Sequence, residues 1–163
     1  MQAISYRVPF IGALLLLLVL GACAPATAGG SVRQPLELGR ETVEVNPGTS
    51  VYLLTRNSLK ELGFREGELD VVQFVSETAS RSSGRADPWM GLEPVRVPVG
   101  WNVSLAAARF VHEAGEDITV QSVIRVDVPA GADLGPVQLR LELQGRRSPV
   151  SLTVPLRVRF GSS

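Results

Sequence analysis

The sequence predicts an all-β domain, a sandwich of about seven short strands. Three stretches in its C-terminal third alternate apolar and polar residues, a period that is typical of strands with one buried face. Turn residues such as Gly, Pro and Asn separate these and several shorter apolar stretches, and almost no stretch after the N-terminus has helical spacing. Many short strands divided by turns favour two antiparallel sheets packed face to face.

The chain begins with a stretch that has the features of a signal peptide. An apolar run extends from Pro9 to Leu20, after a short, mildly polar segment whose only cation is Arg7. Its length of about 12 residues falls within the roughly 7–15 residues of a signal-peptide core, whereas a helix that spans a membrane needs about 20. We therefore expect residues 1–22 to form a signal-peptide helix that is removed from the mature protein.

The end of this run carries a second signal. Leu20-Gly21-Ala22-Cys23 resembles the bacterial lipobox, in which an apolar residue and two small residues precede a cysteine. The resemblance implies that the Cys23 thiol receives a diacylglyceryl group and that cleavage occurs before Cys23. In many bacteria an acyl chain such as palmitate then modifies the new amine. The alternative is an ordinary signal peptide in which Cys23 is incidental. Because Cys23 is the only cysteine, an intramolecular disulfide is excluded.

A lipid on Cys23 would determine where the protein resides. Two or more acyl chains hold a protein stably at a bilayer, whereas one chain holds it only marginally. We therefore expect a protein of the bacterial cell envelope, anchored in the outer membrane or on the outer face of the cytoplasmic membrane. Ala24 rather than Asp follows the cysteine, which favours the outer membrane in bacteria that use the familiar retention rule.

The mature chain divides into a tether and one domain. Residues 23–35 are mostly small, contain Gly and Pro, and show no periodicity, so they predict a flexible tether that carries the lipid. Residues 36–163 suit a single β-sandwich domain. The 141 mature residues (163 minus 22) can bury roughly two-thirds of their unfolded surface, which suffices for a core.

The first half of the domain contains short strand patterns. Alternating apolar positions predict a strand from Leu36 to Val45, followed by a turn at Asn46-Pro47-Gly48. A second short strand is expected from Val51 to Thr55. Residues Asn57 to Gly63 have a capping residue, one apolar turn and a terminal glycine, which predicts a single helical turn. The apolar stretch from Leu69 to Val75 predicts a strand that is buried on both faces.

A polar region and a long alternating stretch occupy the middle of the domain. Residues 76–88 are rich in Ser and Arg and predict a loop of about 13 residues, near the length at which loops become functional or disordered. From Val95 to Leu105 the alternation predicts one uninterrupted strand. Pro94 and Pro98 lie off its apolar face and indicate an edge strand or a β-bulge.

The C-terminal third has the strongest strand patterns. Strands are expected from Ile118 to Val128, from Val137 to Leu143 and from Val154 to Phe160, each with one apolar and one polar face. Ser122 is the single polar exception on the apolar face of the first. Residues 144–149 suit a hairpin connection, and the longer segment 129–136 suits a crossover between two sheets.

One part of this region resembles a known family. The run from Val126 to Ala132, followed by Gly135 and the strand from Val137 to Leu143, is similar to bacterial immunoglobulin-like modules. The similarity covers residues 95 to 160 at most, and it implies an immunoglobulin-like antiparallel β-sandwich. Val137 stands where such modules often place a corner tyrosine, so the buried hydrogen bond of that tyrosine is not expected here.

Composition and titratable residues argue against catalysis and against nucleic acid. The 16 basic residues balance 16 acidic ones, so no basic field would attract nucleic acid. His112 is the only histidine, and we expect it solvated at a strand end rather than acting as a general base. A zinc site usually takes about three or four ligands, and this chain has only one histidine and one cysteine. We therefore expect no metal site, and we also expect no catalytic residue and no cofactor. Two groups of carboxylates lack the spacing of a calcium loop and are expected to be solvated turn charges: Glu66, Glu68 and Asp70, and Glu113, Glu116 and Asp117.

The two tryptophans bear on what the domain binds. Trp101 continues an apolar face and is expected in the core, whereas Trp89 follows the polar segment and is the better candidate for an exposed aromatic. A core or loop-anchoring role for Trp89 is favoured over contact with a ligand.

We expect a non-enzymatic protein whose sandwich binds an envelope protein or supports an envelope assembly, through its sheet edges and residues 76–93. The alternative is a carbohydrate- or peptidoglycan-binding module with a sugar stacked on Trp89.

Overall fold

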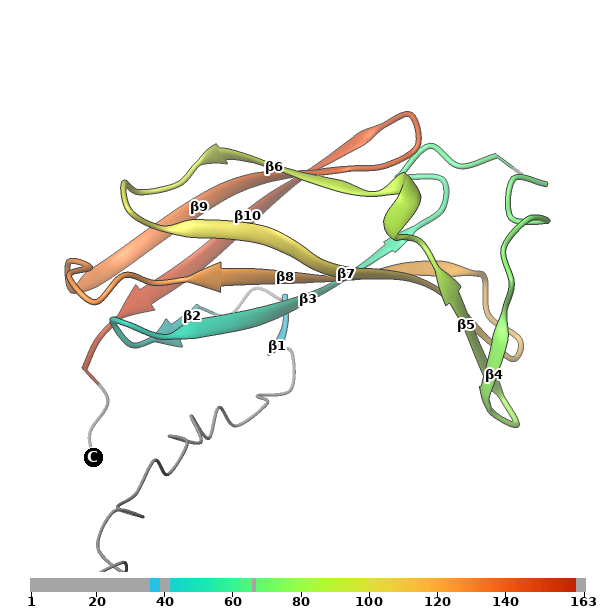
Figure 1. Ribbon diagram of the computed structural model, residues 1–163, viewed down its shortest axis with the longest axis horizontal. Helices are drawn as coiled ribbons and strands as arrows, with labels where there is room; N and C mark the ends of the chain where they lie inside the picture. Colours follow the sequence, from blue (N-terminus) through green and yellow to red (C-terminus); the bar gives the residue numbers. More distant parts are fainter. Residues whose placement is uncertain (1–35, 39–41, 66, 161–163) are drawn as a thin grey trace, which may run out of the picture. The chain divides into compact units, whose positions relative to one another are not determined.

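The domain is a β-sandwich, as the sequence predicts (Figure 1). A computed structural model describes residues 36–38, 42–65 and 67–160. Two sheets pack face to face, and the described residues contain no α-helix. The predicted signal peptide, Cys23 and the predicted tether lie outside the described residues.

The described part of the chain contains ten strands and one short 3-10 helix. The six-stranded sheet contains, in spatial order, β1 (Leu36–Glu37), β3 (Ser50–Ser58), β8 (Thr119–Asp127), β7 (Asn102–Glu113), β5 (Arg81–Arg85) and β4 (Val75–Thr78). The four-stranded sheet contains β2 (Val43–Val45), β10 (Pro149–Val158), β9 (Gly135–Gln144) and β6 (Gly91–Arg96). The 3-10 helix η1 (Asp87–Trp89) precedes β6. All pairings are antiparallel except β1 with β3 and β2 with β10.

The strand order is that of a constant-type immunoglobulin sandwich with an insertion. Such a sandwich places its strands A, B, E and D in one sheet and C, F and G in the other. Here β1, β3, β8 and β7 form the first set, and β6, β9 and β10 form the second. Residues 59–90 are inserted between the second and third strands of this frame, and their hairpin β4–β5 extends the first sheet beyond β7.

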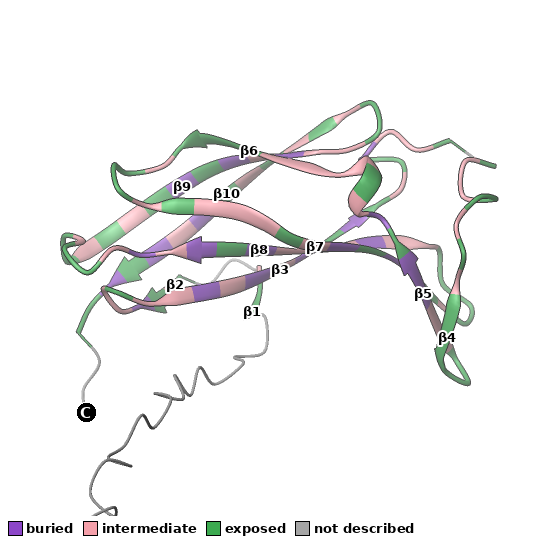
Figure 2. Ribbon diagram, viewed as in Figure 1, coloured by how far each residue is buried: buried purple, intermediate pink, exposed green. Residues whose placement is uncertain are grey.

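The main core lies between the two sheets and consists of the alternating residues that the sequence predicts to be apolar (Figure 2). The inward positions of β8, β9 and β10 are almost completely buried because each strand turns every second side chain toward the other sheet. Trp101 packs against this cluster and is half-buried. The main cluster comprises Val45, Val51, Leu53, Ile124, Val126, Val128, Leu139, Leu141, Val154, Leu156 and Val158.

A second core joins the inserted segment to the sandwich. Phe110 of β7 is fully buried at its centre, and the Phe64 ring meets it edge-on, with centroids 5.2 Å apart and an interplanar angle of 86°. Half-buried side chains of the insertion cover the cluster, including Leu69, Val72 and Phe74. The buried members are Leu62, Ala86, Ala108, Phe110, Val120 and Leu143.

A short polar belt lies on β3 and β8 where the two clusters meet, while Leu92 and Leu152 pack against both clusters. Thr55 and Asn57 of β3 are buried, and Thr55 lies opposite Ser122 of β8, which is fully buried. The Thr55 and Ser122 hydroxyls and the Asn57 Oδ1 atom accept no hydrogen bond from the residues that the structure describes. Ser122 is the polar exception that the sequence indicates, and burial of such groups destabilises the fold.

The expected strand from Leu69 to Val75 is wrong. The segment forms turns and irregular chain until β4 begins at Val75. Some of its apolar side chains are packed on the second core, namely Leu69, Val72 and Phe74. Others face solvent, since Val71 and Val75 are 76% and 67% exposed. Val72 crosses over Gly84 of β5 so closely that a Cβ atom at Gly84 would collide with it. Side-chain burial without backbone pairing explains the apolar pattern.

The expected loop at residues 76–88 is also wrong, because it forms the hairpin β4–β5 and η1. β5 pairs residue by residue with β7, from Arg81 opposite Glu113 to Arg85 opposite Arg109. The hydrogen bonds of this long-range pairing outweigh the low strand propensity of a Ser- and Arg-rich stretch.

The predicted strand from Val95 to Leu105 is interrupted. β6 ends at Arg96, and a turn from Pro98 to Trp101 follows, with a hydrogen bond from the Trp101 N–H to the Pro98 carbonyl (3.2 Å) and Gly100 at φ +83°. The interruption carries the chain from one sheet to the other. Pro94 does lie in an edge strand, and a register shift follows it, so both of its expected roles are confirmed.

Three smaller boundaries also differ from expectation. The first predicted strand divides into β1 and β2, which join different sheets. The expected helical turn begins after Ser58, where the Ser58 Oγ atom accepts from the Glu61 N–H (3.2 Å) and the Ser58 N–H donates to Glu61 Oε2 (2.8 Å). The last strand ends at Val158, so Phe160 is 72% exposed.

Truncation of Phe110 tests the second core. Because Phe110 is fully buried, Phe110→Ala should lower the free energy of unfolding by about 3–5 kcal/mol, measured by urea denaturation. The matched control Phe160→Ala removes an exposed ring and should change it by less than about 0.5 kcal/mol. Equal effects of the two substitutions would contradict this description of the core.

Candidate functional site

The hairpin β4–β5 is the candidate site for interaction with a partner. It forms the end of the six-stranded sheet, and β4 is its outermost strand (Figure 1). All four residues of β4 are exposed. Within the described residues β4 pairs only with β5, so its outer edge faces solvent.

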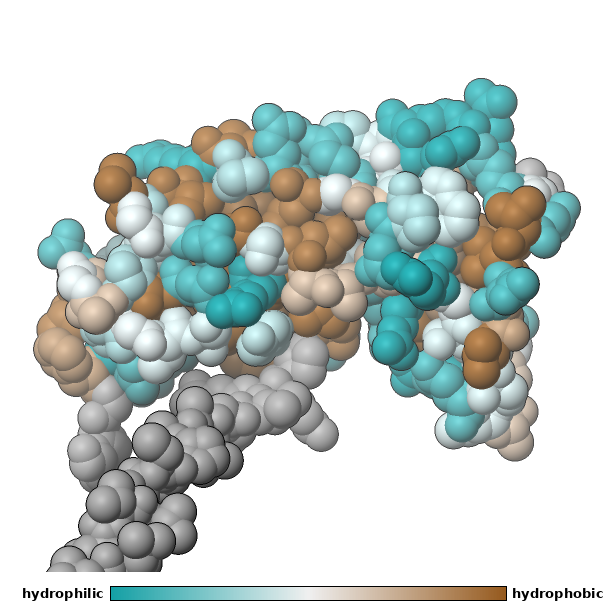
Figure 3. Space-filling model, in the orientation of Figure 1, coloured by the Kyte–Doolittle hydropathy of each residue, from teal (hydrophilic) through white to brown (hydrophobic). Residues whose placement is uncertain are grey.

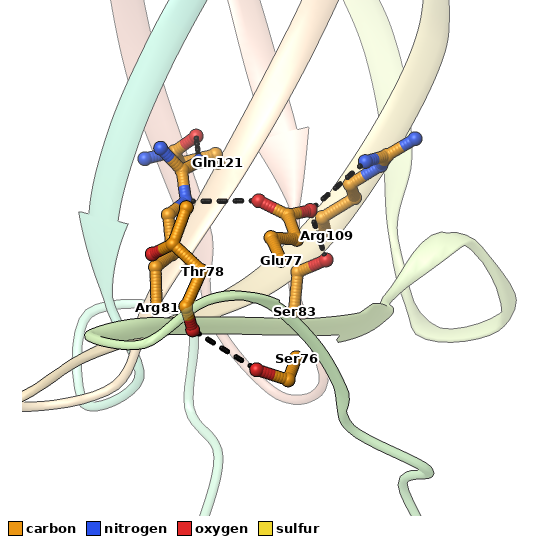
Figure 4. Close-up of polar contacts among 7 residues, drawn as sticks. All are labelled: Ser76, Glu77, Thr78, Arg81, Ser83, Arg109 and Gln121. Atoms are coloured by element: carbon orange, nitrogen blue, oxygen red, sulfur yellow. Dashed lines mark hydrogen bonds and ion pairs between the residues drawn. The ribbon is translucent and has the colours of Figure 1, made fainter.

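Glu77 of β4 connects the hairpin to the rest of the sheet (Figure 4). Its carboxylate accepts a hydrogen bond from the Ser83 hydroxyl (2.5 Å) and forms ion pairs with Arg81 Nε (3.1 Å) and Arg109 Nη1 (3.4 Å). Arg81 also donates to Gln121 Oε1 (3.3 Å). The network therefore spans four strands, from β4 through β5 and β7 to β8.

The register of β4 explains why Glu77 points into this network. The pairing with β5 shifts between Ser76 and Thr78, which leaves Glu77 as an extra residue. Such bulges redirect a side chain. Val111 lies on the same outer face, since its neighbour Phe110 faces the core, and yet Val111 is only 2% exposed. The contacts of Glu77 thus attach the hairpin to the sheet.

A second set of contacts attaches the inserted segment to the β9–β10 turn. Arg147 Nη1 donates to the Gly63 carbonyl and to Glu68 Oε2, both at 2.8 Å, and its other terminal nitrogen pairs with Glu68 Oε1. The Arg65 N–H also donates to Glu68 (2.7 Å). The hydrogen bond from Arg147, followed by that from Arg65, lowers the pKa of Glu68 to about 2. Glu68 is therefore a bound carboxylate and not the free turn charge that was expected.

Trp89 anchors η1 to the second core, which is the role favoured from sequence. Its ring lies 5.8 Å from that of Phe110, measured between centroids, at 51°. The Asp87 carboxylate accepts from the Ala108 N–H (2.7 Å) and from Arg85 Nε (3.2 Å). Partial burial opposes ionisation of Asp87, but these hydrogen bonds outweigh it and lower its pKa.

Trp89 also lines a hollow of about 160 Å³. Phe64, Val72 and Phe110 supply apolar surface there, and Glu68 and Arg146 supply charge. Small-molecule sites usually measure about 300–1,000 Å³. The half-buried ring is therefore a partial wall of a small hollow and not a broad platform for a sugar.

His112 lies in a second shallow hollow of about 200 Å³ beside the hairpin, with Ser76, Ser80 and Ser82. It is exposed near the end of β7, as expected. Among the described residues, no group of three or more His, Cys, Asp or Glu side chains is placed to hold a metal ion.

Exposed apolar residues lie beside β4. Val71 and Val75 are two of the most exposed large apolar side chains in the described chain. Figure 3 shows hydrophobic surface on the part of the molecule that carries this hairpin, next to hydrophilic surface. Isolated exposed valines are common, but Val75 belongs to the unpaired edge strand, and Val71 lies four residues before it in the sequence.

Comparisons with known proteins add no family. A scan against protein-family models found no match, and a search of curated proteins found no similar sequence at a significant level. Among the described residues there is no helix with the length and apolar character needed to cross a membrane.

The contact between Glu68 and Arg147 can be tested by titration. Because folding lowers the pKa of Glu68 from 4.5 to about 2, the stabilisation is complete above about pH 4.5 and is lost as the pH falls toward 2. Arg147→Gln should return the pKa of Glu68 toward 4.5, measured by carboxyl-carbon NMR, whereas Arg56→Gln should leave it unchanged. A low pKa that persists without Arg147 would contradict this assignment.

Proposed function

We propose that this chain is a lipid-anchored protein of the bacterial cell envelope whose non-catalytic sandwich binds a protein partner through β4. The exposed outer edge of β4 is the observation that carries this proposal. An unpaired edge strand presents backbone donors and acceptors that an extended segment of another protein can pair with. The Glu77 network supports it, because a strand held in place loses less conformational freedom on binding.

The other sheet edges are less suited to such pairing. β6 contains Pro94, which lacks an N–H, and its register shifts beside that residue. β1 and β2 comprise only two and three residues. β4 offers a longer edge than β1 or β2, and its first residue, Val75, presents an exposed apolar side chain.

The membrane attachment rests on the N-terminal sequence. The lipobox at Leu20-Gly21-Ala22-Cys23 supports a lipid anchor on Cys23, and residues 23–35 support a flexible tether. A short tether would hold the sandwich close to the membrane surface. A partner in the same envelope compartment would then meet β4 at a high local concentration.

A carbohydrate or peptidoglycan ligand is the alternative function. The hollow at Trp89 supports it, because an aromatic ring lies there beside the charged side chains of Glu68 and Arg146. The small volume and the packing of Trp89 on Phe110 make it the weaker of the two proposals.

A lysine at the β4 edge should block binding of the partner. We expect the full-length, tagged protein to co-purify with a reproducible partner from detergent-solubilised membranes. Val75→Lys should reduce that recovery by about tenfold or more, because natural proteins use an edge lysine to prevent strand pairing.

Val99→Lys provides the matched control, since Val99 is fully exposed and far in sequence from β4. It should leave the recovery unchanged. Equal recovery with Val75→Lys would argue against β4 as the site. Retention on isolated cell wall with no protein partner would favour the carbohydrate alternative instead.

The anchor can be tested separately. Cys23→Ala removes the thiol that would carry the lipid, so we expect an uncleaved or mislocalised precursor that no longer incorporates labelled fatty acid. Gel mobility and fatty-acid labelling measure this. Normal maturation and anchoring of the variant would rule out the lipobox.

A further inference from the structure

The outer face of the four-stranded sheet carries four charged side chains that form no ion pair within the described part of the chain. Glu93 of β6 lies directly opposite Glu142 of β9, and Arg96 of β6 lies directly opposite Arg140 of β9. Like charges in directly opposite positions destabilise a sheet. Arg140 and Glu142 are two residues apart on one strand, so the pairs form a basic row and an acidic row about 7 Å apart.

A β-bulge creates the basic row. Glu93 and Arg96 are three residues apart, and in a regular strand their side chains would point to opposite faces. The register shift between Pro94 and Arg96 places Arg96 opposite Arg140, on the face that carries Glu93. Val95 is the extra residue and is 56% exposed. The bulge therefore directs Arg96 to the outer face of the sheet.

The four charged side chains are available for an external contact. None of them forms an ion pair with another residue in the described part of the chain. Glu93, Arg96 and Arg140 are exposed, and Glu142 is half-buried. Gln144 donates from Nε2 to Glu93 Oε2 (3.2 Å) and to Glu142 Oε2 (3.4 Å), which holds the two carboxylates side by side.

We propose that this face binds the same face of a second copy of the chain. A two-fold axis that runs across the strands, between the two rows, places the acidic row of each copy over the basic row of the other. Glu93 of one copy then meets Arg96 of the second, and Glu142 meets Arg140, as an isologous contact requires. Stacked sheets lie about 10 Å apart, a distance that Arg and Glu side chains reaching from opposite sheets span.

The neighbouring strand leaves room for this approach. On β10, Ser151 lies opposite Glu142 and Thr153 lies opposite Arg140, and both are short exposed side chains. The face is about 33 Å long and about 14 Å wide over three strands, so the pair would bury roughly 1,000 Å² in total, at the low end for a specific interface. The geometry favours a weak dimer that salt weakens further.

The same axis suits two copies on one membrane. Because it runs across the strands, both copies keep their β2 edges on the same side of the dimer. The described chain begins with β1 and β2, so two anchors of the kind proposed above would leave from that side. Attachment to one membrane raises the effective concentration of a weak dimer.

Charge reversal tests the pairing. Two differently tagged copies of the full-length protein are mixed in excess detergent, and their co-capture is measured with light scattering as a second readout. Arg96→Glu with Arg140→Glu makes both rows acidic, and Glu93→Arg with Glu142→Arg makes both rows basic. Each double variant should self-associate at least about tenfold more weakly than wild type, because like charges then face each other.

A mixture of the two double variants should regain association, and so should the quadruple variant that carries all four substitutions. This recovery would exclude misfolding as the cause of the loss in each double variant. Arg56→Glu with Lys60→Glu changes the net charge as much as the acidic double variant does, at exposed positions, and should leave association unchanged. Wild-type copies that remain monomeric up to roughly 100 μM overturn the proposal. So does undiminished association of either double variant, or a mixture that stays dissociated. Val75→Lys leaves these four charges intact and should self-associate like wild type. Failure of dimerisation and failure of partner binding at β4 can therefore be distinguished.

Discussion

β8 pairs with β3 along one side and with β7 along the other, and this central strand positions the rest of the six-stranded sheet. Its inward side chains are fully buried between the sheets, where apolar burial contributes about 25 cal/mol per Å². β7 pairs with β8 along one edge, and the last residues of its other edge, Arg109 to Glu113, serve as the template for β5. The hairpin that we propose as a binding site thus depends on the same ladder that organises the core.

Elements that a local sequence pattern determines were predicted correctly. Elements that depend on contacts between residues far apart in the sequence were not. The strand from Ile118 to Val128 could be predicted because its alternation reflects burial of one face, whatever its neighbours are. The β4–β5 hairpin could not, because polar residues become strands there only through pairing with β7 and through Glu77. The contact of Glu68 with Arg147 joins residues 79 positions apart and leaves no local pattern. The anchoring role of Trp89 was predicted correctly, whereas lipid attachment at Cys23 stays a prediction.

The surfaces proposed for binding belong to different sheets and do not compete. β4 lies at the edge of the six-stranded sheet, and the charged rows lie on the outer face of the four-stranded sheet. A dimer formed through the second surface would therefore present two free β4 edges. A partner with two matching segments would bind such a dimer more tightly than either site alone, without any new contact. Weak self-association and weak strand pairing together can give stable attachment in an envelope assembly.

The polar belt of Thr55, Asn57 and Ser122 has a consequence for how the domain opens. It lies where two clusters of buried residues meet, joined by Leu92 and Leu152, and the inserted segment packs only on the second cluster. Separate clusters can lose structure in separate steps, and a unit with fewer buried contacts exchanges its amide hydrogens sooner. Residues 59–90 should therefore form the least protected cooperative unit, while β8, β9 and β10 open only with the whole domain. A partner strand paired with β4 would slow that local opening. Binding at β4 would therefore slow amide exchange throughout residues 59–90, including positions that the partner does not contact.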